Sequence, residues 1–233
     1  MLAHELRTPL TSLVVGSRIL LGDAVDKARR REVVRDVAAE AQRLSDAVED
    51  LLVLADLEAT AAVDPEPVSL QVALRTELDR ASRLVPDLSV RTLLAADAPP
   101  LIADGGIVGH LVRNLVAVAV DAVGERGLVE AVLVGEPGGR VRLRVVGRRD
   151  RRDAESEAGR PTAPLRDVAS RVLAERLGGT LSVATGAAFA RADLIVPLGE
   201  GAPGEEASGE EPSSARAGVA SPVESGDDAV TWV

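Results

Sequence analysis

The chain has 233 residues, 46% of them hydrophobic, which is enough to bury the core of one or two globular domains. It has no cysteine, which excludes disulfides, thiolate metal sites and cysteine catalysis. An aromatic content of 1% and a net charge of −10 disfavour nucleic-acid binding. No uncharged apolar run reaches the about 18 residues of a membrane span. We therefore expect a cytoplasmic protein with no membrane segment in this chain.

The first predicted element is a helix that ends near Leu21, before Gly22-Asp23, and it carries His4-Glu5-Leu6-Arg7-Thr8-Pro9-Leu10 near its start. At near-neutral pH an imidazole keeps a free nitrogen lone pair that can attack a phosphoryl group. Glu5 can accept the other ring N–H of His4. Thr8 lies four residues on, on the same helical face, where its hydroxyl can hold a water. His4, Glu5 and Thr8 are therefore the candidate catalytic residues.

A second helix is predicted from about Lys27 to Glu58, with an apolar stripe at regular three- and four-residue spacing. The stripe consists of Val34, Val37, Ala41, Leu44, Val48, Leu51 and Ala55. Two helices joined by a short loop form an antiparallel hairpin, and one hairpin cannot cover such a stripe alone. The pattern predicts a homodimeric four-helix bundle built from residues 1–60.

The residues around His4, followed by this helix pair, resemble the dimerisation and histidine-phosphotransfer domain of bacterial two-component histidine kinases. In that family the acid beside the histidine assists autophosphorylation. The pair that corresponds to Glu5 and Thr8 supports dephosphorylation of the partner regulator. The resemblance covers residues 1–60 and implies a response-regulator receiver domain as the partner.

The rest of the chain divides by composition into a linker at residues 61–68, an α/β region at 69–198 and a tail at 199–233. The tail is rich in Gly, Ala, Ser, Pro and Glu, and we expect it to be disordered. In the α/β region the pattern predicts helices at 70–83, 106–123 and 165–177, and strands at 88–94, 101–102, 128–134, 140–146, 180–184 and 189–196. The predicted fold class is α+β multidomain, a helical hairpin followed by an α/β sandwich.

This order of elements resembles the ATP-binding domain of histidine kinases, which is an α/β sandwich. Its landmarks here are Asp104 ahead of the long helix, Arg113-Asn114-Leu115 within it, and Leu177-Gly178-Gly179-Thr180-Leu181-Ser182-Val183 near the end. The resemblance implies a nucleotide site along the long helix.

The long helix lacks most of the residues that the resemblance requires for Mg-ATP. In the family a second asparagine binds Mg²⁺, and a basic residue and an aromatic follow. The corresponding positions here are Val118, Asp121 and Ala122. Asn114 matches the first asparagine and is the only asparagine in the chain. Valine offers no oxygen ligand to a hard cation, and Asp121 adds negative charge near the phosphates unless it binds a metal in a rearranged site.

Two further elements also depart from the family. The Asp-x-Gly-x-Gly turn aligns with Gly147, Arg149 and Arg151, and arginine side chains obstruct the close approach that glycine permits. The last glycine-rich element aligns with Pro164-Leu165-Arg166-Asp167. We therefore expect no bound ATP and no metal site, with Asn114 as a weak remaining cofactor-binding candidate.

Two other features each have two interpretations. Arg148, Arg149, Arg151 and Arg152 can form an anion site, but acids follow at once and favour a self-neutralising charged lid. His110 can be a second acceptor or a metal ligand, but an ordinary partly buried histidine is the favoured interpretation.

Three functions remain open from the sequence. The first is a phosphotransferase or regulator phosphatase that moves a phosphoryl group between His4 and a receiver aspartate without its own ATP binding. The second is an active sensor histidine kinase that uses Mg-ATP to phosphorylate His4. The third is a non-catalytic dimerisation partner that sequesters a regulator or pairs with an intact kinase.

Overall fold

The structure is a computed structural model and describes residues 2–22, 26–59, 65–85, 87–95, 98–123, 126–149 and 164–198. The predicted tail at 199–233 and the charged stretch from residue 150 to 163 lie outside these residues.

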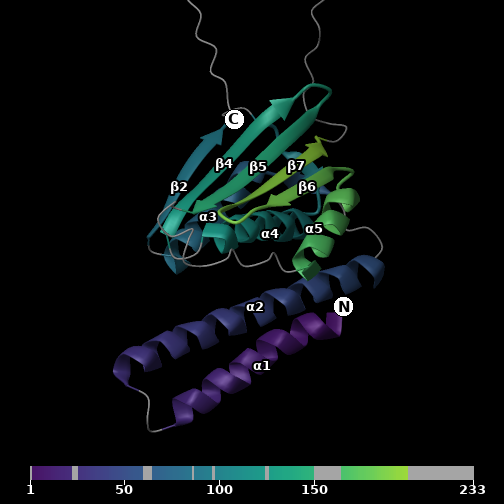
Figure 1. The fold of residues 1–233 in the computed structure, drawn as a ribbon. Coiled ribbons are helices and arrows are strands. Elements are labelled where there is room, and N and C mark those ends of the chain that lie inside the picture. The colour runs from purple at the N-terminus through teal and green to yellow at the C-terminus, as the bar shows by residue number, and fades with distance from the viewer. Residues whose placement is uncertain are drawn as a thin grey trace, which may run out of the picture. The chain divides into compact units, whose positions relative to one another are not determined.

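Two long helices form the N-terminal part of the chain (Figure 1). Helix α1 spans Leu2–Leu21 and helix α2 spans Lys27–Ala59, so both predicted helices are confirmed. They pack along each other, and a Cβ built on Gly16 of α1 would overlap the side chain of Val37 of α2. Because the connection is short, the two helices run antiparallel, as the sequence predicted.

The apolar stripe of α2 is only partly covered within one chain. Val34 is 49% exposed and Val48 is 43% exposed. Ala41 and Ala55, at the same seven-residue spacing, are also exposed. The alternate members of the stripe, Val37, Leu44 and Leu51, are half-buried. One side of the stripe therefore remains uncovered along α2.

The rest of the described chain forms one sheet covered by helices, with a small strand pair beside it. The elements are β1 (Glu66–Val68), α3 (Leu70–Leu84), β2 (Asp87–Leu94), β3 (Leu101–Ala103), α4 (Gly105–Val123), β4 (Arg126–Glu136), β5 (Arg140–Arg149), α5 (Pro164–Arg176), β6 (Thr180–Thr185) and β7 (Phe189–Pro197). The five-stranded sheet has the order β2-β4-β5-β7-β6, in which only the β2–β4 pair is parallel.

Strict alternation of side chains makes this sheet two-faced. Leu133, Leu143 and Leu194 are paired in register across β4, β5 and β7, and each is at most 1% exposed. The opposite face carries charged side chains such as Arg144, which forms an ion pair with Asp193. The helices α3, α4 and α5 cover the apolar face, so the predicted α/β sandwich is confirmed (Figure 1).

Strand β1 was not predicted by the sequence pattern, which assigned residues 61–68 to a linker. Glu66–Val68 pairs antiparallel with Leu101–Ala103 of β3. The strand has three residues and contains Pro67, which lacks the N–H that a ladder needs and is confined to sheet edges. A strand this short has no periodic signal of its own.

Polar caps and glycine define the ends of the helices that matter for the site. Asp104 caps α4, because its carboxylate accepts hydrogen bonds from the backbone N–H groups of Gly106 (2.7 Å) and Ile107 (3.2 Å). Helix α5 ends at a left-handed Gly178 (φ 67°). The N–H of Gly179 donates to the carbonyl of Ala174 at 2.8 Å. The predicted Gly178-Gly179 stop is thus confirmed as a Schellman motif.

Helix α4 is the central element of the α/β domain. Within the described ranges it is the one helix long and apolar enough, by length and composition, to cross a membrane. It packs instead under the sheet, where Leu111, Val112 and Leu115 are fully buried. The length and apolar character of α4 are therefore those of a core helix.

Candidate functional site

The candidate catalytic residues His4, Glu5 and Thr8 lie in the first two turns of α1, the predicted phosphoacceptor turn. His4 and Glu5 are in the helix, but their side chains lie outside the described part of the structure. Thr8 is exposed on α1, and the helix continues through the buried Pro9. The geometry among His4, Glu5 and Thr8 therefore stays a prediction.

Because α1 and α2 run antiparallel, the contact at Gly16 shows which part of α2 lies beside the turn that carries His4. Gly16 faces Val33 and Val37. Moving twelve residues back from Gly16 reaches His4, and moving twelve forward from Val33 and Val37 reaches residues 45 and 49. The phosphoacceptor turn therefore lies level with the C-terminal half of α2, and α1 also contacts α5.

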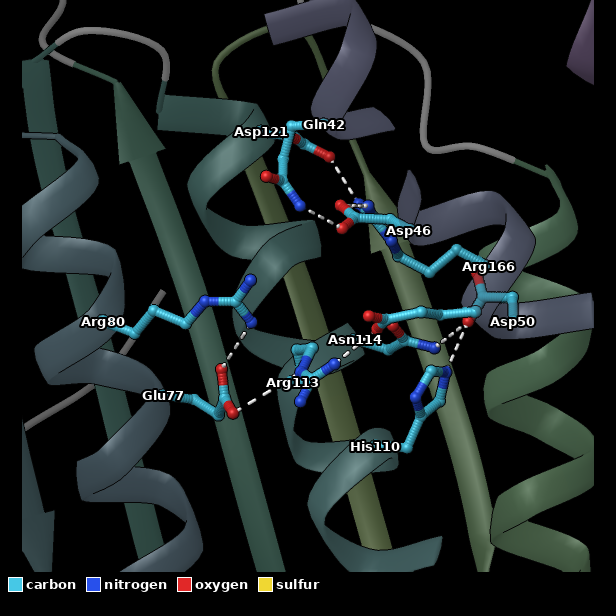
Figure 2. Close-up of polar contacts among 11 residues, drawn as sticks. Gln42, Asp46, Asp50, Glu77, Arg80, His110, Arg113, Asn114, Asp121 and Arg166 are labelled. Atoms are coloured by element: carbon cyan, nitrogen blue, oxygen red, sulfur yellow. Dashed lines mark hydrogen bonds and ion pairs between the residues drawn. The ribbon is translucent and has the colours of Figure 1, made fainter. Parts of the chain in front are cut away.

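Asn114, the weak cofactor candidate, points away from solvent into a contact with α2 (Figure 2). It is 3% exposed, and its Nδ2 donates to Oδ1 of Asp50 at 2.8 Å. His110 lies one turn earlier on α4, is 8% exposed, and its Nε2 is 2.7 Å from the same oxygen. Because a carboxylate only accepts, Nε2 of His110 carries a hydrogen. The amide of Asn114 is thus engaged by a protein carboxylate.

The position that corresponds to the metal ligand is apolar and closed. Val118 is 4% exposed and packs with Ala122, Ala190 and Val183 in a small cluster between α4 and the sheet. None of these four side chains has a polar atom. None of these four side chains therefore offers an oxygen ligand to a hard cation.

Gly147 aligns with the aspartate of the Asp-x-Gly-x-Gly turn, which the resemblance implies would contact the adenine, and it leaves no room for a side chain. A Cβ built there would overlap the backbone carbonyl of Ala119 in α4. Helix and strand therefore touch through their backbones at this point, and glycine is needed for the close approach.

Arg166, from the last glycine-rich element, is buried in ion pairs. Its side chain is 5% exposed, with Nη1 2.6 Å from Oδ2 of Asp121 and Nη2 3.1 Å from Oδ2 of Asp46 (Figure 2). Asp121 is the residue at the expected basic position of α4. The two departures from the family motif therefore contact each other directly.

These features together do not fit the Mg-ATP chemistry that the resemblance implies. Val118 offers no ligand, Gly147 has no space for a carboxylate, and Arg166 is held by two acids. Within the described ranges no group of three or more His, Cys, Asp and Glu side chains is arranged to hold a metal ion.

A cleft of about 980 Å³ lies between the C-terminal part of α2 and the start of α4. Val53 and Leu57 line it from α2, and Gly105, Gly109 and His110 line it from α4. Its charged lining residues are three acids, Asp56, Glu77 and Asp104, and two arginines, Arg113 and Arg176, with His110 beside them. The acids outnumber the arginines, so this lining does not favour an anion.

The sequence did not reveal Asp46 and Asp50 as site residues. Acids are frequent on the polar face of α2, so a carboxylate that becomes buried looks like its exposed neighbours. His110, expected to be an ordinary partly buried histidine, is buried and bonded to a helix 60 residues away in sequence. A spacing of four residues between Asp46 and Asp50, and again between His110 and Asn114, was the available signal.

Comparison with protein families matches residues 1–60 to the His Kinase A (phospho-acceptor) domain. The chain is 26% identical over 137 residues to the adaptive-response sensory kinase SasA of Prochlorococcus marinus (strain MIT 9215). That alignment covers 58% of this chain and 36% of SasA, so the chain spans about a third of its relative's length.

Solved structures of histidine kinases share the fold. Acinetobacter baumannii AdeS matches with a TM-score of 0.56 at 15% identity, over 84% of this chain and 98% of AdeS. ThkA, in complex with the response regulator protein TrrA, matches with a TM-score of 0.59 at 16% identity, over 84% and 60%. ShkA, in complex with AMPPNP, matches with 0.54 at 24% identity, over 86% and 45%. Residues 1–60 therefore match a histidine-kinase phospho-acceptor domain, and the described chain has the fold of histidine kinase structures.

Replacing Gly147 by alanine tests the closure of the adenine position. We expect Gly147→Ala to lower the free energy of unfolding by about 1–3 kcal/mol or more, because the new Cβ overlaps the Ala119 carbonyl. Gly135→Ala in β4 is the matched control, since open space surrounds a Cβ there, and we expect a change below about 1 kcal/mol. Urea unfolding followed by circular dichroism measures both. Equal stability of the two variants would show that the adenine position is open.

Proposed function

We propose that this chain is a phosphotransferase and regulator phosphatase of the histidine kinase family that works through His4 without binding ATP itself. In the transfer step a nitrogen of His4 attacks the phosphoryl group on a receiver aspartate. A P–N bond forms as the acyl P–O bond breaks, and the aspartate leaves as a carboxylate. The reverse step returns the phosphoryl group to a regulator. Glu5 orients the imidazole, and Thr8 positions the water that hydrolyses the regulator's phosphoryl group.

The observation that supports this proposal most strongly is the sequence from His4 to Leu10, which lies within a region that matches a phospho-acceptor domain. Thr8 is exposed on α1, which suits a residue that acts on a bound partner protein. ThkA, a relative in fold, is described in complex with a response regulator, which supports a partner of the same class for this chain.

The chemistry along α4 and α5 supports the absence of ATP binding. The metal position is a buried valine, and the position of the adenine-reading aspartate is a glycine without side-chain space. Each loss removes a different part of Mg-ATP recognition, so restoring one residue does not restore the site. An autokinase that uses Mg-ATP is the competing function, because the relative SasA is a sensory kinase.

The uncovered side of the α2 stripe supports a homodimer through residues 1–60. Val34, Ala41, Val48 and Ala55 repeat every seven residues, which is the spacing at which helices supercoil around a partner. On α1, Leu10 and Val14 are also exposed, at 53% and 45%. A second copy that covers these faces completes a four-helix bundle.

Phosphoryl transfer to His4 is testable with a receiver domain carrying a radiolabelled aspartyl phosphate. We expect the wild-type protein to take up label or to accelerate its loss, and His4→Ala to abolish uptake, because the one other histidine, His110, is buried against Asp50. We expect Thr8→Ala to slow regulator dephosphorylation more than transfer. Autoradiography after gel separation measures uptake.

The nearest control is His110→Gln, which removes the other histidine and leaves the phosphoacceptor sequence intact. Its uptake of label should match that of the wild type. If His4→Ala and wild type carried the same label, His4 would not be the acceptor. Label from ATP alone would support the autokinase instead.

Charge placed on the uncovered stripe tests the dimer. We expect wild type to sediment as a dimer at tens of micromolar and Val48→Glu to sediment as a monomer, because an unpaired carboxylate is costly in an apolar interface. Val72→Glu on α3, where the side chain is 64% exposed, is the control and should remain dimeric. Analytical ultracentrifugation gives the result, and a monomeric wild type would contradict the bundle.

A further inference from the structure

The face of the α/β domain formed by α4 and α5 is occupied by helix α2. Asp50 of α2 is 1% exposed and receives hydrogen bonds from two donors of α4, His110 and Asn114. A buried carboxylate is stable only where such partners satisfy it. The two donors are four residues apart on α4, so they lie one above the other and converge on one oxygen (Figure 2).

A second acid binds one turn away. Asp46 precedes Asp50 by four residues, and its carboxylate lies 3.1 Å from Nη2 of Arg166. Arg166 also binds Asp121 of α4, so this one guanidinium joins α2, α4 and α5. Its side chain is 5% exposed, whereas Asp46 and Asp121 are 25% and 39% exposed, so solvent screens these ion pairs less than it screens a fully exposed pair.

Apolar contacts continue the same face of α2 toward its C-terminus. Val53 and Leu57 follow Asp50 at three and seven residues and pack against the main core of the α/β domain. The four residues therefore form one helical stripe of two acids and two apolar side chains. At the rim, Nη1 of Arg113 lies 2.5 Å from Oε2 of Glu49.

This docked stripe lies on the opposite side of α2 from the proposed dimer stripe. Asp46 and Val48, and likewise Leu57 and Ala55, are two residues apart, which is about 200° around a helix. Docking of the domain and pairing of two copies therefore use different sides of α2. The docked stripe also lies level with the phosphoacceptor turn, since residues 45–49 are opposite residue 4.

We infer that the α4–α5 face is a binding site for an acidic helix, and that its ligand is α2 of the same chain. Asn114, Asp121 and Arg166 stand at positions where the family resemblance places nucleotide chemistry. Here Asn114 and Arg166 bind α2, and Asp121 pairs with Arg166. The domain is thereby clamped at the level of the phosphoacceptor turn without a nucleotide. This inference does not depend on phosphoryl transfer.

The docking of α2 on the α4–α5 face is testable by measuring the distance between two spin labels in the full chain. The protein has no cysteine, so Ser45→Cys on α2 and Glu175→Cys on α5, both at exposed positions, carry the only labels. Diluting labelled with unlabelled protein makes pairs between subunits rare. We expect one narrow distance distribution by double electron–electron resonance.

Charge reversal separates specific pairing from general damage. Arg166→Glu faces Asp46 and Asp121 with a like charge, so the distribution should broaden toward longer distances. Asp46→Arg combined with Arg166→Glu should restore the narrow distribution. Arg171→Glu is the matched control, because Arg171 lies on α5 but pairs with Asp167 of its own helix, and it should change nothing.

A broad distribution without any charge reversal, or a narrow one in Arg166→Glu, would overturn the inference. Circular dichroism checks that each variant folds. If Arg166→Glu does not fold, Asp46→Arg alone applies the same repulsion from α2 and should broaden the distribution. Because the readout is a distance, its failure leaves the phosphoryl-transfer assay unaffected.

Discussion

The buried carboxylate of Asp50 is the constraint on which the arrangement of the described chain depends. A charged group that is removed from water must receive hydrogen bonds from the protein. Here His110 and Asn114 of α4 each donate one to Asp50, at 2.7 and 2.8 Å. Removing either partner leaves buried polar atoms unsatisfied. The register between α2 and α4 is therefore fixed by a polar contact and not by apolar area alone.

Helix α4 consequently has two packing surfaces. One is apolar and covers the sheet, where Leu111 and Leu115 are fully buried and Gly147 admits the backbone of Ala119. The other is polar and faces α2. At two positions where the family resemblance implies nucleotide chemistry, Val118 offers no metal ligand and Gly147 leaves no space for a carboxylate side chain. The same residues that stabilise the fold therefore oppose the family's ATP chemistry.

Much of this fold was predictable because its elements have strong periodic signals. The Lys27–Ala59 helix and the β4–β5 hairpin follow from their apolar spacing, and the end of α5 follows from Gly178. The strand Glu66–Val68 was not predictable, since three residues with a proline carry no period. The proposal of His4 as the acceptor rests on its sequence neighbours and stays a prediction.

The polar contacts between helices were the least predictable part. Asp46 and Asp50 look like ordinary surface acids in the sequence, and only long-range packing turns one of them into a fully buried group. Arg166 likewise showed in the sequence that a family glycine is missing, but the sequence did not show that its side chain pairs with Asp46 and Asp121. Pairwise contacts at a separation of 60 residues or more leave no local pattern to read.

We propose that this chain transfers phosphoryl groups through His4 without binding a nucleotide itself. Isothermal titration calorimetry of the full chain with Mg-ATP tests it most directly. We expect no saturable heat up to millimolar nucleotide, because the metal position is valine and the adenine position is closed. A dissociation constant in the micromolar range would contradict it.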